Sequence, residues 1–221
     1  AALGSGVIVQ PNGVILTNHH VIDGAQQIKV ELSNHRIFDA KVLGSDPPSD
    51  LAVLKIQTKD LAALGLADSD RVRVGDIALA VGNPLGIGQT VTAGIISAKG
   101  RSTGLSDGSF EDFLQTDAPI NPGNSGGPLL DSHGRMIGIN SQILSPAGGS
   151  VGVGFAIPAE TVKTIADRLK HKGTVSRGWI GVEVQSVSPD IVEGLGLNKP
   201  VYGVLVAEIQ LLHGREFGSS C

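Results

Sequence analysis

A serine flanked by glycines is the first candidate for chemistry in this chain. Residues 123–128 read Gly-Asn-Ser-Gly-Gly-Pro, and the apolar pair Leu129 and Leu130 follows them. Glycines on both sides of Ser125 favour a tight turn that exposes its hydroxyl and lets backbone N–H groups converge beside it. Glycine clusters also form ordinary turns, so an acyl-transfer nucleophile requires a base and an orienting carboxylate elsewhere in the chain.

Two adjacent histidines and one aspartate are candidates for those roles. His19 and His20 follow an apolar run that begins at Val14, and Asp50 directly precedes the apolar run 51–56. A serine hydroxyl does not ionise unaided near neutral pH, so a histidine must take its proton and a carboxylate must orient that histidine. The chain order histidine, aspartate, serine is that of chymotrypsin-like double barrels and differs from the subtilisin and α/β-hydrolase orders.

Each of these residues also has a purely structural interpretation. His20 could be a core histidine with its polar atoms satisfied, His19 beside it is the alternative base, and Asp50 could be a turn carboxylate after Pro48. Alternation along a β-strand would point the two histidines to opposite faces. On that hypothesis only one of them can reach Ser125.

Five collinear motifs resemble those of the HtrA (Deg) family of serine proteases. They are residues 17–21 (Thr-Asn-His-His-Val), 49–55 (Ser-Asp-Leu-Ala-Val-Leu-Lys), 82–86 (Gly-Asn-Pro-Leu-Gly), 92–97 (Thr-Ala-Gly-Ile-Ile-Ser) and 121–130. The family motif has its histidine directly before the valine that is Val21 here, which favours His20 over His19. The resemblance implies a catalytic triad of His20, Asp50 and Ser125.

The turn around the serine also supplies the expected oxyanion hole. The backbone N–H groups of Gly123 and Ser125 are the expected donors, and Asn124 lies between them. Two donors aimed at the developing alkoxide contribute on the order of several kcal/mol in the transition state. Many secreted trypsin-like proteases carry aspartate where Asn124 stands, to receive a newly cut N-terminus. The asparagine suggests activation by loop rearrangement, as in the family.

The resemblance places Ile120, Ile143 and Leu144 around the primary specificity pocket. All three are aliphatic, and an apolar pocket without a buried carboxylate favours small or medium aliphatic residues before the scissile bond. The function implied is an ATP-independent serine endopeptidase that cleaves unfolded or damaged proteins and needs no cofactor. The alternative is a chaperone-like protein that binds unfolded chains while its triad is held inactive.

Composition and patterning indicate an all-β protein. The hydrophobic fraction is 41%, yet only five Phe, one Tyr and one Trp are present, so aliphatic residues must fill the core of a chain with 31 glycines. We expect a chymotrypsin-like double six-stranded β-barrel, with barrels at about residues 1–85 and 90–157. Helical spacing of apolar residues predicts a closing helix over 158–172, and the protease domain is expected to span 1–174.

The sequence changes character after residue 174. Arg177, Gly178, Trp179, Ile180 and Gly181 resemble the loop that opens the PDZ domain of HtrA proteases, where N–H groups receive a peptide C-terminus. The resemblance ends near residue 209, so 175–209 is expected to be an incomplete PDZ-like segment and 210–221 a tail left by truncation or expression. A peptide-binding adaptor acting through 177–209 is a further alternative, which this short segment disfavours.

Charge and composition argue against several partners. The net charge is −4 without a basic run of five residues, which disfavours nucleic acid, and no apolar stretch reaches about 18 residues, so membrane association is not indicated. No histidine pair has metal-ligand spacing, so no metal is expected. Cys221 is the single cysteine and leaves the compartment undecided. The resemblance implies a periplasmic or otherwise extracytoplasmic location, a signal sequence outside this chain, and unfolded or misfolded proteins as substrates. It also implies a homotrimer for the full-length protein.

Overall fold

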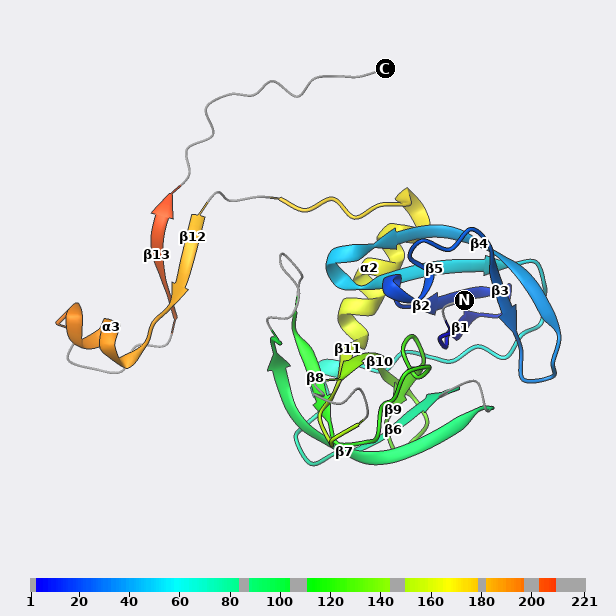
Figure 1. The fold of residues 1–221 in the computed structure, drawn as a ribbon, viewed down its shortest axis with the longest axis horizontal. Coiled ribbons are helices and arrows are strands. Elements are labelled where there is room, and N and C mark those ends of the chain that lie inside the picture. Colours follow the sequence, from blue (N-terminus) through cyan, green and yellow to red (C-terminus); the bar gives the residue numbers. More distant parts are fainter. Residues whose placement is uncertain are drawn as a thin grey trace, which may run out of the picture. The chain divides into compact units, whose positions relative to one another are not determined.

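Short apolar strands separated by tight turns build the first of two units in this computed structural model. The structure describes residues 3–83, 88–103, 111–143, 150–178, 182–196 and 203–209. The units are Ala1–Val175 and Ser176–Cys221 (Figure 1). All three residues of the predicted triad belong to the first unit.

The first unit opens with a five-stranded antiparallel sheet in the order β1-β2-β5-β4-β3. Its strands are β1 (Val7–Gln10), β2 (Val14–Thr17), β3 (Ile28–Glu31), β4 (Ile37–Asp46) and β5 (Leu51–Ile56). The turn between β1 and β2 requires glycine, because Gly13 has φ 94° and a Cβ there would lie 2.4 Å from Ile56 O. Along the outer edge of β1, Leu64 N donates to Ile8 O at 2.8 Å.

Six further strands form a closed barrel, drawn in green in Figure 1. They are β6 (Ile77–Gly82), β7 (Thr90–Arg101), β8 (Phe113–Thr116), β9 (Pro128–Leu130), β10 (Met136–Ile143) and β11 (Gly154–Pro158). The all-β, trypsin-like fold class is confirmed. However, the expected extent of the first barrel to about residue 85 is wrong, because β6 pairs with β7 and β9 and so belongs to the second barrel. The first sheet is therefore a five-stranded half-barrel.

Helix α2 (Ala159–Lys172) closes the first unit, near the expected position. Its N-cap is Pro158, whose fixed φ suits a helix start, and its C-cap Gly173 has φ 71°, the left-handed conformation that ends helices. The helix packs against β4 and β5 of the open sheet and against β10 and β11 of the barrel. Helix α2 therefore contacts both the open sheet and the closed barrel.

One apolar cluster spans the open sheet, the barrel and α2. Its most buried members include Leu16, Val53, Met136, Ile139 and Leu169, each no more than 2% exposed. Burying an aliphatic side chain of this size stabilises a fold by about 1.5–3 kcal/mol. This shared core holds the open sheet and the barrel in a fixed relation, which a site divided between them requires.

The second unit contains an antiparallel pair of strands, β12 (Val182–Ser186) and β13 (Val204–Ile209), and the short helix α3 (Pro189–Gly194). Several apolar side chains of the two strands are exposed, Ile209 at 66% among them. Of the predicted peptide-binding loop, Arg177 and Gly178 are described, whereas Trp179, Ile180 and Gly181 lie outside the described residues.

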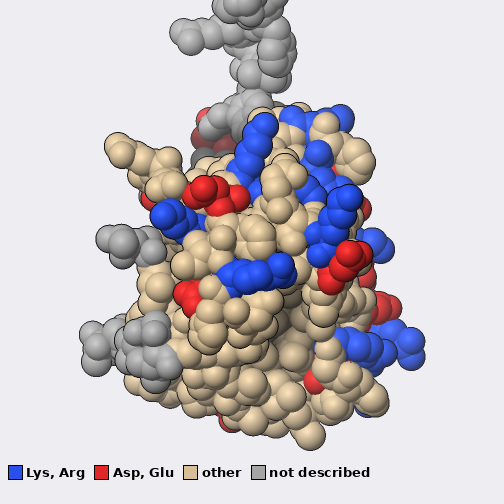
Figure 2. All heavy atoms as spheres, turned by 90° about the vertical axis from the view of Figure 1, so that its right-hand side faces the viewer, with Lys and Arg blue, Asp and Glu red and all other residues tan. Residues whose placement is uncertain are grey.

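The surface and the helices bear on partners as well. On the face drawn in Figure 2, Lys and Arg side chains are interspersed with Asp and Glu side chains. In the described segments, no helix is long and apolar enough to cross a membrane. In those segments, no group of three or more His, Cys, Asp or Glu side chains could hold a metal ion.

Candidate active site

The two adjacent histidines lie on α1 (His19–Ile22), a single helical turn directly after β2. The expectation that β alternation separates them is therefore wrong, since successive helical residues point about 100° apart instead. The ring of His20 lies with Nδ1 2.8 Å from Asp50 Oδ2. The ring of His19 faces elsewhere, with Nδ1 2.6 Å from Ser45 Oγ. The structure thus pairs His20, and not His19, with the carboxylate.

Asp50 is held in place from several directions. It is the C-cap of the short 3-10 helix η1 (Pro47–Ser49) and has φ 54°, a left-handed conformation that aspartate tolerates better than most residues. Asn18 Nδ2 donates to its carbonyl at 2.9 Å, and His20 N donates to its Oδ1 at 3.0 Å. Because Asp50 accepts, the His20 Nδ1 carries the proton and Nε2 is left as an acceptor.

Ser141 connects the histidine–aspartate pair to the predicted nucleophile. Its hydroxyl donates to Asp50 Oδ2 at 2.8 Å, and its carbonyl accepts from Ser125 Oγ at 3.0 Å. Ser141 lies on β10 of the barrel and is only 3% exposed. Among the described residues, the Ser125 hydroxyl bonds to Ser141 and not to His20. Rotation about the Ser125 Cα–Cβ bond, between staggered positions, would redirect that hydroxyl.

The turn that carries Ser125 depends on glycine at two positions. Gly123 and Gly126 have φ 103° and 84°, conformations that favour glycine. Asn124 N donates to Asn121 O at 2.9 Å, which closes the turn. Within the described part of the chain, neither Gly123 N nor Ser125 N donates to a protein acceptor, so both N–H groups are available to a ligand.

The predicted specificity pocket is described only in part. Ile120 is 1% exposed and lies against Gly154, where an added Cβ would be 2.8 Å from Ile120 Cδ1. The register of β10 and β11 places Ile143 opposite Gly154. The side chain of Ile143, and Leu144 entirely, lie outside the described residues. Two of the three predicted positions therefore flank one glycine.

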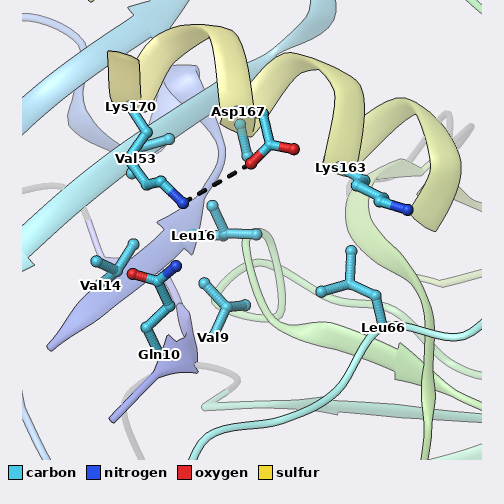
Figure 3. Close-up of a pocket in the computed structure, with 10 residues that line it drawn as sticks. Val9, Gln10, Val14, Leu16, Val53, Leu66, Lys163, Asp167 and Lys170 are labelled. Carbon is cyan, nitrogen blue, oxygen red and sulfur yellow. Dashed lines mark ion pairs between the residues drawn. The ribbon is translucent and has the colours of Figure 1, made fainter. Parts of the chain in front are cut away.

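A cavity of about 110 Å³ lies away from these residues, between α2 and the open sheet (Figure 3). Val14, Leu16 and Val53 form part of its apolar lining. At its rim, Lys170 Nζ lies 3.7 Å from Asp167 Oδ1. None of the predicted triad residues lines it, so this cavity is separate from the candidate active site.

Sequence reasoning missed two serines that the structure places at the site. Ser141 follows Asn140, and these two buried polar residues come directly after the run Met-Ile-Gly-Ile that begins β10. Ser5 lies between Gly4 and Gly6 just before β1, and its backbone N donates to Ser125 O at 2.8 Å. A buried polar pair at the end of an apolar run is a usable signal, whereas nothing local distinguishes Ser5 from a turn residue.

Known proteins resemble this chain in sequence. The family described as Trypsin-like peptidase domain matches residues 4–139. The periplasmic pH-dependent serine endoprotease DegQ of Escherichia coli (strain K12) is 51% identical over 209 residues, which are 94% of this chain and 46% of that protein. A probable periplasmic serine endoprotease DegP-like of Pseudomonas fulva (strain 12-X) is 50% identical over 208 residues, 94% of this chain and 43% of that protein.

Solved structures resemble it as well. The HtrA-type protease AlgW with tripeptide has a TM-score of 0.88 and 51% sequence identity, covering 96% of this chain and 70% of that chain. A serine endoprotease from Yersinia pestis has a TM-score of 0.73 and 45% identity, covering 86% of this chain and 67% of that chain. The chain spans less than half the length of the curated relatives it matches.

Proposed function

The chain belongs to the HtrA-type family of trypsin-like serine proteases, and we propose that it hydrolyses peptide bonds through an acyl-enzyme formed on Ser125. The observation that carries this proposal is the hydrogen-bonded series from His20 through Asp50 and Ser141 to Ser125. It draws the two β-structures together at one point. His20 Nε2 remains an acceptor in this arrangement. The His20 side chain is 49% exposed and is therefore accessible to substrate.

Catalysis begins when the Ser125 hydroxyl turns from Ser141 O towards His20. His20 Nε2 takes the hydroxyl proton while Oγ attacks the scissile carbonyl, and Asp50 stabilises the imidazolium that results. The alkoxide accepts hydrogen bonds from Gly123 N and Ser125 N. His20 then protonates the leaving amine, and a water molecule that loses a proton to His20 hydrolyses the acyl-enzyme.

Substrate preference follows from the walls around Ile120. We propose that the residue before the scissile bond enters an apolar pocket formed by Ile120, Ile143 and Leu144 beside Gly154. A lysine or arginine there would lose its hydration without a partner, so small or medium aliphatic residues are preferred. A peptide with valine before the scissile bond should therefore be cleaved faster than its lysine counterpart, and the reverse order would refute the pocket assignment.

The proposed substrates are unfolded or misfolded proteins, bound in extended form without ATP or metal. The decisive test is cleavage of a reduced, unfolded protein at neutral pH with EDTA present. The parent should cleave the protein and Ser125→Ala should not. Ser132→Ala is the matched control, because Ser132 also lies beside a histidine, with Oγ 3.4 Å from a ring nitrogen of the exposed His133, but neither residue belongs to the proposed triad. Equal cleavage by the parent and Ser125→Ala would refute Ser125 as nucleophile.

A chaperone-like binder with an inactive triad is the second candidate. The observation in its favour is the Ser125 hydroxyl bond to Ser141 O in place of His20. A fluorophosphonate that reacts only with an activated serine separates the two functions. Rapid labelling of the parent supports the protease, whereas binding of unfolded protein without labelling supports the binder.

We further propose that the closed barrel self-associates through the outer face of β6 and β7. Ile77 pairs with Ile95 across the strands, and they are 53% and 42% exposed. Val91 on the same strand as Ile95 is 59% exposed. Contiguous exposed apolar residues favour burial against a partner. A homotrimer, as the family resemblance implies, would cover this face with identical copies.

Two further proposals concern the cellular location of the protein and the role of its second unit. Because relatives of about 50% identity are named periplasmic, we propose an extracytoplasmic location. We assign residues 175–209 to part of a PDZ-like domain, with Arg177 to Gly181 as the loop that receives a peptide C-terminus. Titration with a peptide that ends in a free carboxylate, against its amidated form, tests that loop.

A further inference from the structure

Ser5 makes four hydrogen bonds, to three different segments of the chain. Its backbone N donates to Ser125 O at 2.8 Å, and its hydroxyl donates to Gly123 O at 2.6 Å. The same hydroxyl accepts from Asn83 N at 2.9 Å, and the Ser5 carbonyl accepts from Thr17 Oγ1 at 2.7 Å. We propose that Ser5, through its hydroxyl, is a positioning residue for the oxyanion hole. This inference rests on the protease function proposed above.

The contacts of Ser5 lie on the two peptide groups that flank the one carrying the Ser125 N–H donor. Gly123 O and Asn124 N belong to one peptide group, which the Ser5 hydroxyl holds on its carbonyl side. The Ser125 carbonyl, held by Ser5 N, belongs to the peptide group that follows Ser125. The remaining group, with Asn124 O, accepts from Gly127 N at 2.9 Å. Ser5 therefore fixes the first and third of three consecutive peptide groups around the nucleophile.

The fit between Ser5 and the nucleophile turn is close. A Cβ on Gly126 would lie 2.2 Å from Ser5 O and 2.3 Å from Thr17 Oγ1. The turn thus has no room to shift towards Ser5, and the Ser5 hydroxyl limits its movement in the opposite direction. An N–H donor stabilises an alkoxide only when it is aimed at that atom. Gly123 N belongs to the peptide group before the one that the Ser5 hydroxyl holds, and the two groups meet at Gly123 Cα, so holding the Gly123 carbonyl restricts the directions that Gly123 N can take.

Ser5 connects the turn to two other parts of the site, through its hydroxyl to Asn83 and through its carbonyl to Thr17. Asn83 follows the end of β6, and its Oδ1 accepts from Gly88 N at 2.8 Å. Thr17 ends β2, immediately before the segment that carries His20. Ser5 thus holds Thr17 before the histidine segment, Asn83 at the end of β6 and the oxyanion turn in register.

The test compares Ser5→Ala, Ser5→Thr and the parent on a peptide with valine before the scissile bond. Positioning predicts that Ser5→Ala lowers kcat about 10-fold while KM changes less than about twofold, since substrate binding is untouched. Ser5→Thr keeps the hydroxyl and should retain most of kcat. Ser69→Ala is the matched control, because Ser69 is 2% exposed and accepts from Glu160 N far from the site.

Amide hydrogen exchange gives a readout that needs no catalysis. In Ser5→Ala, the segment 118–130 should exchange several-fold faster than in the parent, whereas in Ser69→Ala it should not. A kcat for Ser5→Ala within twofold of the parent, or equal losses in Ser5→Ala and Ser5→Thr, would overturn the proposal. A parent without cleavage activity would refute the protease function, and unchanged exchange in Ser5→Ala would then separately refute the role of Ser5. If Ser5→Ala does not fold, Ser5→Cys, with its weaker hydrogen bonds, should give the same changes to a smaller extent.

Discussion

Replacing Ser141 by alanine removes a barrel hydroxyl that donates to the Asp50 carboxylate. The Ser141 carbonyl, which accepts from Ser125, stays in place. A hydrogen bond to a charged acceptor contributes about 1.5–3 kcal/mol. The Asp50 side chain is 26% exposed, so water replaces part of the lost bond and the lower end of that range applies. About 1.4 kcal/mol corresponds to a tenfold lower kcat/KM for Ser141→Ala.

The assay is steady-state hydrolysis of the valine peptide by the parent, Ser141→Ala and Ser141→Thr. The threonine variant keeps the hydroxyl and should recover most of the activity. Thermal unfolding of each protein shows whether the fold survives. A Ser141→Ala enzyme within twofold of the parent would show that Asp50 needs no support from the barrel. Equal losses in the two variants would assign the effect to packing.

Three further changes have expected outcomes. Ile120→Ala should widen the pocket and raise the ratio of kcat/KM for leucine over valine peptides about 10-fold; an unchanged ratio would remove Ile120 from the pocket. Burial by itself would raise the pKa of Asp131. Hydrogen bonds from Arg135 and from the His133 backbone, together with the Arg135 charge, outweigh that effect and lower the pKa below 3.8. Asp131→Asn should therefore cost about 0.5–1 kcal/mol of unfolding free energy at pH 6, and this difference should shrink at pH 3, as the carboxylate of the parent is protonated. Urea unfolding at both pH values checks this, and an equal difference at both would contradict it. Ile77→Asp should shift the molar mass in light scattering towards the monomer, whereas Ile37→Asp should not, although Ile37, on the open sheet, is 62% exposed against 53% for Ile77; equal behaviour would exclude the β6–β7 face as the interface.

The strands and the closing helix could be predicted because their signals are local. Pro158 and Gly173 limit α2, and the apolar runs set the strands. Barrel membership could not be read in the same way, since the pairing of β6 with β7 depends on contacts between distant segments. The prediction that the first barrel extends to about residue 85 relied on sequence order, and sequence order does not specify the partner of a strand.

In the candidate site, too, local features could be predicted from the sequence and contacts between distant segments could not. The glycines around Ser125 and the positions of His20 and Asp50 are visible in the sequence, although their catalytic roles stay predictions. The one-turn helix that carries the histidines is too short to leave a periodic signal. The contacts of Ser141 and Ser5 depend on the docking of the open sheet against the barrel, which no local pattern encodes.

In the proposed mechanism, His20 activates Ser125. To test this activation, the parent is incubated with a fluorophosphonate at neutral pH and the adduct is located by peptide mass spectrometry. We expect one adduct, on Ser125, that is abolished in Ser125→Ala and strongly slowed in His20→Ala. An adduct on another residue, or labelling of Ser125 at the same rate in His20→Ala, would contradict it.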